Sequence, residues 1–198
     1  MLCLIGRLGL GFLWGLKYHG LKNVPRTGGV ILAANHQSLV DPVLVGCALG
    51  CGLSREIHFM ARKTLFEIPV LGRLIVALNA FPITRDSGDV KGVRTALERL
   101  KKGSALLVFP EGTRTLDGRI GQMKAGIRLL AERAAVPIVP VLIVGAYKSW
   151  PKGRAWPRLS GRVDVIYGRP IAADALVGDV LREQVVGLES KLPRKTGA

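Results

Sequence analysis

Short apolar runs alternate with amphipathic segments along most of the chain, and this alternation restricts the possible folds more than any other feature. The candidate strands are residues 29–34, 57–61, 81–83, 104–109, 136–144 and 162–167. Apolar side chains recur at helical spacing in the segments between or after them, at residues 39–49, 70–78, 89–102, 123–134 and 180–192. Because such alternation is typical of parallel sheets covered by helices, we expect an α/β domain with a largely parallel central sheet flanked by helices.

Proline, glycine and aspartate residues mark several expected element ends. Pro69 suits the start of the helix at 70–78, and Asp89 can cap the helix that Gly103 ends. Pro137 and Pro140 interrupt the run at 136–144. Since proline cannot donate a hydrogen bond within a sheet, we expect that strand to lie at an edge or to begin irregularly.

The first 20 residues differ in composition from the rest of the chain. Residues 1–16 are rich in large apolar side chains, contain Arg7, and are too short to span a bilayer. We expect residues 1–20 to form a short N-terminal membrane-associated helical segment, with Trp14 and Tyr18 at the level of the lipid headgroups. The alternative is a helix packed on the main domain, which is expected at residues 21–198.

The charge balance points to an anionic partner. The 198 residues include 29 Lys and Arg against 14 Asp and Glu, a net charge of +15. Nucleic acid, anionic lipid and a phosphorylated substrate all fit this charge. An aromatic content of 6% and the scattering of the basic residues disfavour nucleic acid. Three cysteines give no disulfide framework and indicate a reducing compartment, and Cys47 and Cys51 are expected in the core rather than in a metal site.

A histidine and a carboxylate lie five positions apart, directly after the apolar run at 29–34. If His36 ends a strand and Asp41 begins a helix, the two side chains can converge. A histidine held by a carboxylate is a common general base near neutral pH. The alternative is a histidine hydrogen-bonded into a turn, and Ser38 is interpreted as a turn residue.

A second candidate site follows the apolar run at 104–109. Residues 109–114 read Phe-Pro-Glu-Gly-Thr-Arg, in which Gly112 lets the backbone turn closely and Arg114 can clamp a phosphate. A surface turn with a Glu111–Arg114 ion pair is the alternative. Further cations at or near the ends of candidate elements are Arg85, Lys63 and Lys124. Because ligands of open α/β sheets bind at the carboxyl ends of the strands, we expect these groups to share one site.

These blocks, in this order, resemble the glycerolipid acyltransferase family, most closely the bacterial 1-acylglycerol-3-phosphate acyltransferases. The family's Asn-His-x-x-x-x-Asp block is matched by Asn35, His36 and Asp41, its Phe-Pro-Glu-Gly-Thr-Arg block by residues 109–114, and its Val-Pro-Ile-Val-Pro-Val block by residues 136–141. The second block, at residues 79–85, lacks the family's glycine and inserts Pro82 but keeps Arg85. The resemblance covers residues 20–170.

The resemblance implies transfer of a fatty acyl group from acyl-CoA or acyl-carrier protein to the free hydroxyl of 1-acylglycerol-3-phosphate, giving phosphatidic acid. It implies that His36 is the base and that Asp41 orients it, without a cofactor or a metal. The residues expected to bind the acceptor are Arg85, Glu111, Gly112, Thr113 and Arg114, with Lys63 and Lys124 as further candidates.

A lipid acceptor also implies a peripheral enzyme on the cytoplasmic face of the membrane. We expect residues 1–22 and the helix at 70–78 to face the bilayer. The alternatives are another acceptor, such as glycerol 3-phosphate or a lyso-aminolipid, and a non-catalytic basic protein that binds lipid or nucleic acid.

Overall fold

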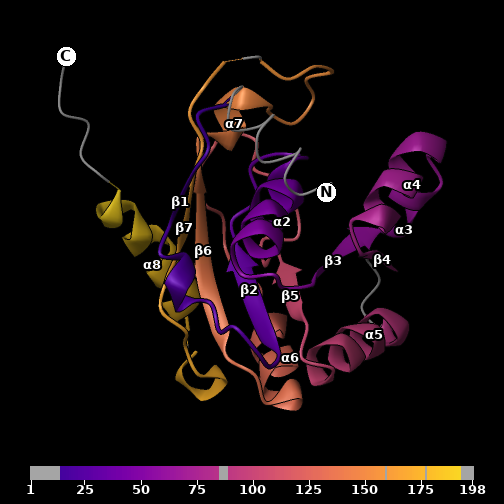
Figure 1. Cartoon of the computed structure of the whole chain (residues 1–198), viewed down its shortest axis with the longest axis vertical. Coiled ribbons are helices and arrows are strands. Elements are labelled where there is room, and N and C mark those ends of the chain that lie inside the picture. Colours follow the sequence, from indigo (N-terminus) through magenta and orange to yellow (C-terminus); the bar gives the residue numbers. More distant parts are fainter. Residues whose placement is uncertain (1–13, 85–88, 159, 177, 193–198) are drawn as a thin grey trace.

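The computed structural model describes residues 14–84, 89–158, 160–176 and 178–192, and within them a seven-stranded sheet crosses the molecule (Figure 1). Its strands are β1 (Lys17–His19), β2 (Val30–Ala34), β3 (Ile57–Arg62), β4 (Ala80–Ile83), β5 (Ala105–Val108), β6 (Ile138–Val144) and β7 (Asp164–Tyr167). Their order is β1-β7-β6-β2-β5-β3-β4. Strands β6, β2, β5, β3 and β4 are parallel, whereas β7 is antiparallel to β6 and pairs in parallel with β1. The prediction of a largely parallel α/β sheet flanked by helices is confirmed.

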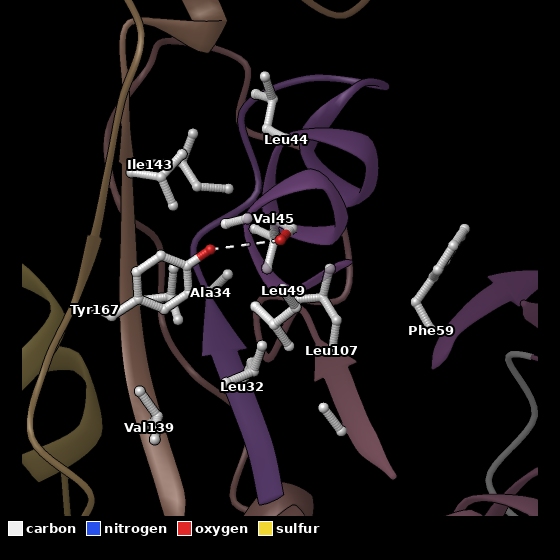
Figure 2. Close-up of a cluster of buried hydrophobic side chains, with 14 of the residues drawn as sticks. Leu32, Ala34, Leu44, Val45, Leu49, Phe59, Leu107, Val139, Ile143 and Tyr167 are labelled. Atoms are coloured by element: carbon white, nitrogen blue, oxygen red, sulfur yellow. Dashed lines mark hydrogen bonds between the residues drawn. The ribbon is translucent and has the colours of Figure 1, made fainter. Parts of the chain in front are cut away.

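Helices cover both faces of this sheet. On one face, α2 (Asp41–Gly52), α3 (Lys63–Phe66), α4 (Pro69–Ala77) and α7 (Ala146–Ser149) contribute to one apolar cluster; on the other, α5 (Val90–Lys101), α6 (Gly126–Ala134) and α8 (Val180–Gly187) contribute to a second. Because side chains alternate along a strand, Leu32 and Ala34 of β2 enter the first cluster and Ile31 and Ala33 the second. Figure 2 shows the first cluster, in which Tyr167 donates to Val45 O at 3.4 Å.

The ends of α5 are as predicted. The Asp89 carboxylate accepts a hydrogen bond from Gly92 N at 2.8 Å, and Gly103 follows the helix with a φ of 86°. Two other predicted helices are shorter than expected. The segment at 123–134 becomes helical only at Gly126, and the last helix ends at Gly187 and continues as a 3₁₀ turn, Leu188–Lys191. Further 3₁₀ turns are Leu21–Asn23 and Ala173–Ala175.

Of the two alternatives expected for the strand at 136–144, an edge position or an irregular start, the edge position is wrong. Strand β6 lies between β7 and β2, and Pro140 pairs with Ala33 of β2. β7 ends at Tyr167, opposite Val141, and the next contact on that side of β6 is an isolated bridge to Ile171. Pro140 faces the interval between them, where Gly168 N donates to Pro140 O at 2.8 Å. The Pro140 ring therefore lies where the ladder between β6 and β7 is already interrupted. An interior strand tolerates a proline at such a position.

The chain joins the domain earlier than the predicted boundary at residue 21. Trp14 is buried, its indole donates to Arg158 O at 2.7 Å, and β1 follows at Lys17. The expectation that Trp14 lies among lipid headgroups is therefore wrong, and the Tyr18 hydroxyl is likewise turned inward, donating to Leu44 O at 2.9 Å. The rest of the predicted N-terminal segment, residues 1–13, lies outside the described residues. Within the described ranges, every helix is too short or too polar to cross a bilayer.

Candidate active site

The loop between β2 and α2 carries His36, and a buried amide fixes the start of this loop. Asn35 Nδ2 donates to Ile143 O at 3.0 Å, while Ile143 N donates to Asn35 Oδ1 at 2.7 Å. The side chain thus makes the pair of hydrogen bonds that a neighbouring strand would make with β6. The loop leaves the carboxyl end of β2 in a fixed direction.

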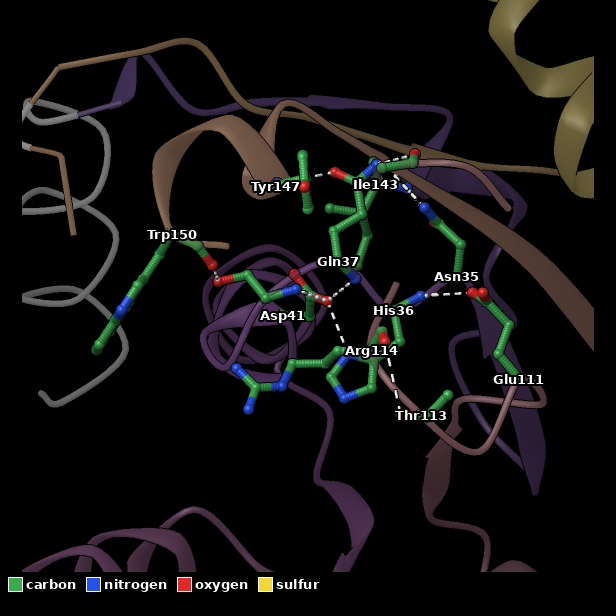
Figure 3. Close-up of polar contacts among 12 residues, drawn as sticks. Asn35, His36, Gln37, Asp41, Glu111, Thr113, Arg114, Ile143, Tyr147 and Trp150 are labelled. Atoms are coloured by element: carbon green, nitrogen blue, oxygen red, sulfur yellow. Dashed lines mark hydrogen bonds and ion pairs between the residues drawn. The ribbon is translucent and has the colours of Figure 1, made fainter. Parts of the chain in front are cut away.

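His36 in this loop forms a hydrogen-bonded pair with Asp41, the first residue of α2 (Figure 3). His36 Nδ1 lies 2.8 Å from Asp41 Oδ2, and the same oxygen accepts from Gln37 N at 2.6 Å and Ser38 N at 2.8 Å. Backbone N–H groups can only donate, so this buried oxygen is an acceptor and Nδ1 carries the proton that it shares with Asp41. The basic lone pair of the imidazole is therefore on Nε2.

The imidazole is packed as well as hydrogen-bonded. Its ring stacks on Phe109, with centroids 3.9 Å apart and planes 17° from parallel. The His36 side chain nevertheless remains 20% exposed. The ring is thus held in one orientation while part of it stays accessible to a reactant.

Glu111 supports the backbone of the histidine. Its Oε1 accepts from His36 N at 2.8 Å and its Oε2 from Gly121 N at 2.9 Å, while Thr115 N donates to His36 O at 2.8 Å. The 109–114 turn and the β2–α2 loop are therefore joined on both sides of His36. The alternative of a Glu111–Arg114 ion pair does not occur: both carboxylate oxygens accept backbone N–H groups, and across the described ranges Arg114 makes no ion pair.

Most of the other predicted acceptor-binding residues lie on the 109–114 turn or cross over it. Gly112 has a φ of 70°, and Lys124 crosses over it, so that a Cβ at Gly112 would lie 3.2 Å from Lys124 Nζ. Thr113 is exposed beside the half-buried Arg114, whose neighbour Thr115 is bonded to His36. Lys63 is exposed at the start of α3, after the carboxyl end of β3. Arg85 lies outside the described residues, so its role stays a prediction.

Sequence reasoning missed the contribution of α7 and the segment around it. Tyr147 N donates to Gln37 Oε1 at 3.1 Å, and the Ser38 hydroxyl donates to Trp150 O at 2.9 Å. These contacts hold the residues that follow His36. They join positions more than 100 residues apart, which no local pattern reveals.

The arrangement can remove a proton from a hydroxyl next to a cationic turn. A fixed, partly exposed imidazole has its free nitrogen available, and Arg114 and Lys124 supply positive charge on the adjoining turn. In the described part of the chain, no cluster of histidine, cysteine and carboxylate side chains is grouped to hold a metal ion.

Comparison with known proteins gives consistent matches over this region. A family model described as Acyltransferase matches residues 15–144. The chain is 29% identical over 189 residues to the 1-acyl-sn-glycerol-3-phosphate acyltransferase of Bacillus subtilis (strain 168), covering 90% of each chain. It is 31% identical over 159 residues to the chloroplastic enzyme of that name from Arabidopsis thaliana, covering 79% of this chain but 43% of the plant protein.

A solved structure agrees in fold. The crystal structure of the 1-acyl-sn-glycerophosphate (LPA) acyltransferase PlsC from Thermotoga maritima superposes with a TM-score of 0.78 and 29% sequence identity. The match covers 98% of this chain and 80% of that one.

Proposed function

The chain belongs to the acyltransferase family, and from this premise we propose that it transfers a fatty acyl group from an acyl thioester to the free hydroxyl of 1-acyl-sn-glycerol 3-phosphate. The product is phosphatidic acid, and the released group is a thiol. The observation that carries the proposal is the His36–Asp41 pair, held by backbone donors and left partly exposed. The relatives named above share this activity by name, and two of them align with at least 80% of their own length.

His36 acts as the general base in this mechanism. Its Nε2 accepts the proton of the acceptor hydroxyl as that oxygen attacks the thioester carbonyl carbon, and Asp41 stabilises the imidazolium that forms. When the tetrahedral intermediate collapses, the carbon–sulfur bond breaks and the proton passes from Nε2 to the departing sulfur. The chain therefore needs no covalent acyl intermediate. Ser38 has no role as a nucleophile, because its hydroxyl donates to Trp150 O.

The acceptor phosphate is bound by cations on the neighbouring turn. Arg114 offers paired donors that match a phosphate, and the exposed residue Lys124 crosses Gly112. Gly112 keeps the turn free of a side chain beside the Lys124 ammonium group, and Thr113 adds an exposed hydroxyl. Glu111 acts by positioning, because its two oxygens bind His36 N and Gly121 N. Arg85 and Lys63 are further cations proposed for this site.

The donor and the location of the enzyme are also proposals. Both acyl-CoA and acyl-carrier protein present the thioester that the mechanism requires. A lipid acceptor and a net charge of +15 support peripheral association with an anionic membrane surface, and we place the enzyme on the cytoplasmic face. Another acceptor, such as glycerol 3-phosphate or a lyso-aminolipid, is the second candidate. The reason is that the block at residues 79–85, which ends at Arg85, departs from the family pattern.

A transfer assay with two histidine variants tests the proposal. The purified chain is given 1-acyl-sn-glycerol 3-phosphate, glycerol 3-phosphate or a lyso-aminolipid, with acyl-CoA or acyl-carrier protein as donor. His36→Ala is expected to lower kcat by about 10²- to 10⁴-fold. His19→Ala is the matched control, because His19 also lies 2.8 Å from a carboxylate, that of Asp164, and its side chain is 25% exposed.

The outcomes separate the candidate functions. His19→Ala should retain transfer, since that pair joins β1 to β7 away from the β2–α2 loop. Equal rates for wild type and His36→Ala would refute the proposed base. If no acceptor is acylated with either donor, the chain is better explained as a basic lipid-binding protein.

A further inference from the structure

Helix α4 presents an apolar face that no described part of the chain covers. Of the eleven exposed large apolar side chains among the described residues, four lie within nine positions: Ile68, Val70, Leu74 and Val76. Val70 is 82% exposed and Val76 is 58% exposed. Single exposed apolar residues are ordinary, but a cluster of this kind marks a binding surface.

The helix is anchored through its opposite side. Ile75 is buried, and Leu71 and Leu78 pack against the apolar cluster between the sheet and α2. Gly72 lies so close to the carbonyl of Phe66 that a Cβ there would approach its oxygen to 2.4 Å, which fixes α4 against α3. The outward face is thus exposed on a helix that is firmly attached.

The outward face lies at the functional end of the sheet. Strand β3 runs parallel to β5, which is parallel to β2, and leads directly into α3 and α4, just as β2 leads into the His36 loop. Figure 1 shows α4 projecting away from the sheet at this end. Phe66, Pro69, Gly72, Arg73, Val76 and Ala77 line a shallow hollow of about 520 Å³ beside α3 and α4, and Val76 belongs both to this hollow and to the outward face.

We propose that the outward face of α4, formed by Ile68, Val70, Leu74 and Val76, inserts into the surface of a lipid bilayer. The inference rests on the proposed function, since a lysolipid acceptor resides in a bilayer. Charge supports lipid as the occupant: α4 carries no acidic residue, its one charged side chain is the exposed Arg73, and the chain has a net charge of +15. An apolar face that includes a basic residue is suited to the region of a bilayer where the acyl chains meet the anionic headgroups.

Two leucine variants with equal exposure test this assignment. Leu74 on α4 and Leu129 on α6 are 48% and 49% exposed, and the two helices pack on opposite faces of the sheet. Leu74→Glu and Leu129→Glu therefore make the same chemical change at surfaces of the same accessibility. Co-sedimentation of the full chain with vesicles of equal parts phosphatidylcholine and phosphatidylglycerol measures binding.

Leu74→Glu is expected to weaken vesicle partitioning by about tenfold, because an apolar side chain that would enter the acyl region is replaced by a charge. Val70→Glu should act in the same direction, whereas Leu129→Glu should leave binding unchanged. Equal binding by wild type, Leu74→Glu and Val70→Glu would overturn the proposal. So would a fall in molecular mass in light scattering for the α4 variants alone, which would assign the face to contact between copies of the chain.

A second measurement distinguishes failure of this inference from failure of the proposed function. Acyl transfer is compared for acceptor embedded in the same vesicles and acceptor dispersed in detergent. The loss in Leu74→Glu should be larger with vesicles. Equal losses in both would contradict a docking role, while absence of transfer by wild type in both would contradict the proposed function instead.

Discussion

Replacement of Asp41 by Asn isolates the charge that the His36 mechanism requires. One oxygen of Asp41, Oδ2, accepts all three hydrogen bonds, from His36 Nδ1, Gln37 N and Ser38 N. The other, Oδ1, is buried without a hydrogen-bond partner among the described residues. An asparagine can therefore keep its oxygen at the Oδ2 position and place its amide nitrogen where Oδ1 lies. The hydrogen bonds survive and the negative charge is lost.

The size of the expected effect follows from the electrostatics of the pair. For a charge separation of about 4 Å and an effective dielectric constant of about 20, the attraction between carboxylate and imidazolium is about 4 kcal/mol. This corresponds to about 10³-fold in rate if the imidazolium is fully formed in the transition state. Because proton transfer is incomplete there, we expect Asp41→Asn to lower kcat by about 10²- to 10³-fold.

The test compares two quantities for each variant, kcat and the free energy of unfolding. Release of thiol from the acyl donor gives kcat, and urea unfolding gives the free energy of unfolding, which should fall by no more than about 1 to 3 kcal/mol, the cost of one amide group that has no acceptor at the Oδ1 position. Asp41→Ala is the contrasting variant. It leaves Gln37 N and Ser38 N unpaired in a buried site, so it should cost about 2 to 6 kcal/mol of stability, at about 1 to 3 kcal/mol for each group. If Asp41→Asn keeps kcat within about tenfold of wild type, the carboxylate charge does not assist the reaction.

Two further predictions concern the framework around the site. Asn35→Ala leaves Ile143 N and O without their buried partner and should lower the free energy of unfolding by about 2 to 6 kcal/mol; a loss below about 0.5 kcal/mol in urea titration would contradict this role. Burial acts to raise the pKa of Asp164, but hydrogen bonds from Arg162 and His19 outweigh it and hold that pKa below its ordinary value. Its contribution to stability is therefore present above the ordinary carboxyl pKa of about 4 and is lost as the pH falls through the lowered value. Urea unfolding at decreasing pH should show this loss in wild type and a smaller one in Asp164→Asn; parallel curves would refute the assignment.

The features predicted correctly from the sequence are those set by nearby residues. Asp89 and Gly103 each act within one helical turn of α5, and the convergence of His36 and Asp41 needs only a strand end followed by a helix start. Short apolar runs revealed every strand of the described ranges except β1, whose three residues include Lys17 and His19 and carry no such run. Local sequence pattern was therefore sufficient to predict the sheet and the His36–Asp41 pair that follows the carboxyl end of β2.

The features that were missed depend on contacts between distant residues. Glu111 binds His36 N across 75 positions, and Asn35 pairs with Ile143 across 108, so neither role is visible in a short window of sequence. Trp14 fits an interfacial anchor by composition, yet its indole is satisfied by Arg158 O in the folded domain. A tryptophan side chain is equally suited to a protein core and to a membrane surface. Only the tertiary contact shows which of the two locations it occupies.

The departure of this chain from the family pattern, at residues 79–85, lies outside the contacts that hold the His36 loop. Pro82 stands in β4, which is one of the two edge strands among the described residues, and pairs with Ala61 of β3. An edge strand tolerates a proline because one side of its ladder has no partner to lose. The His36 loop is held instead by β6, by Glu111 and by the segment around α7, none of which contains the altered block. Substitutions in residues 79–84 are therefore expected to leave the imidazole in place. If Arg85 binds the acceptor as proposed, acceptor preference and catalysis by His36 are then expected to vary independently.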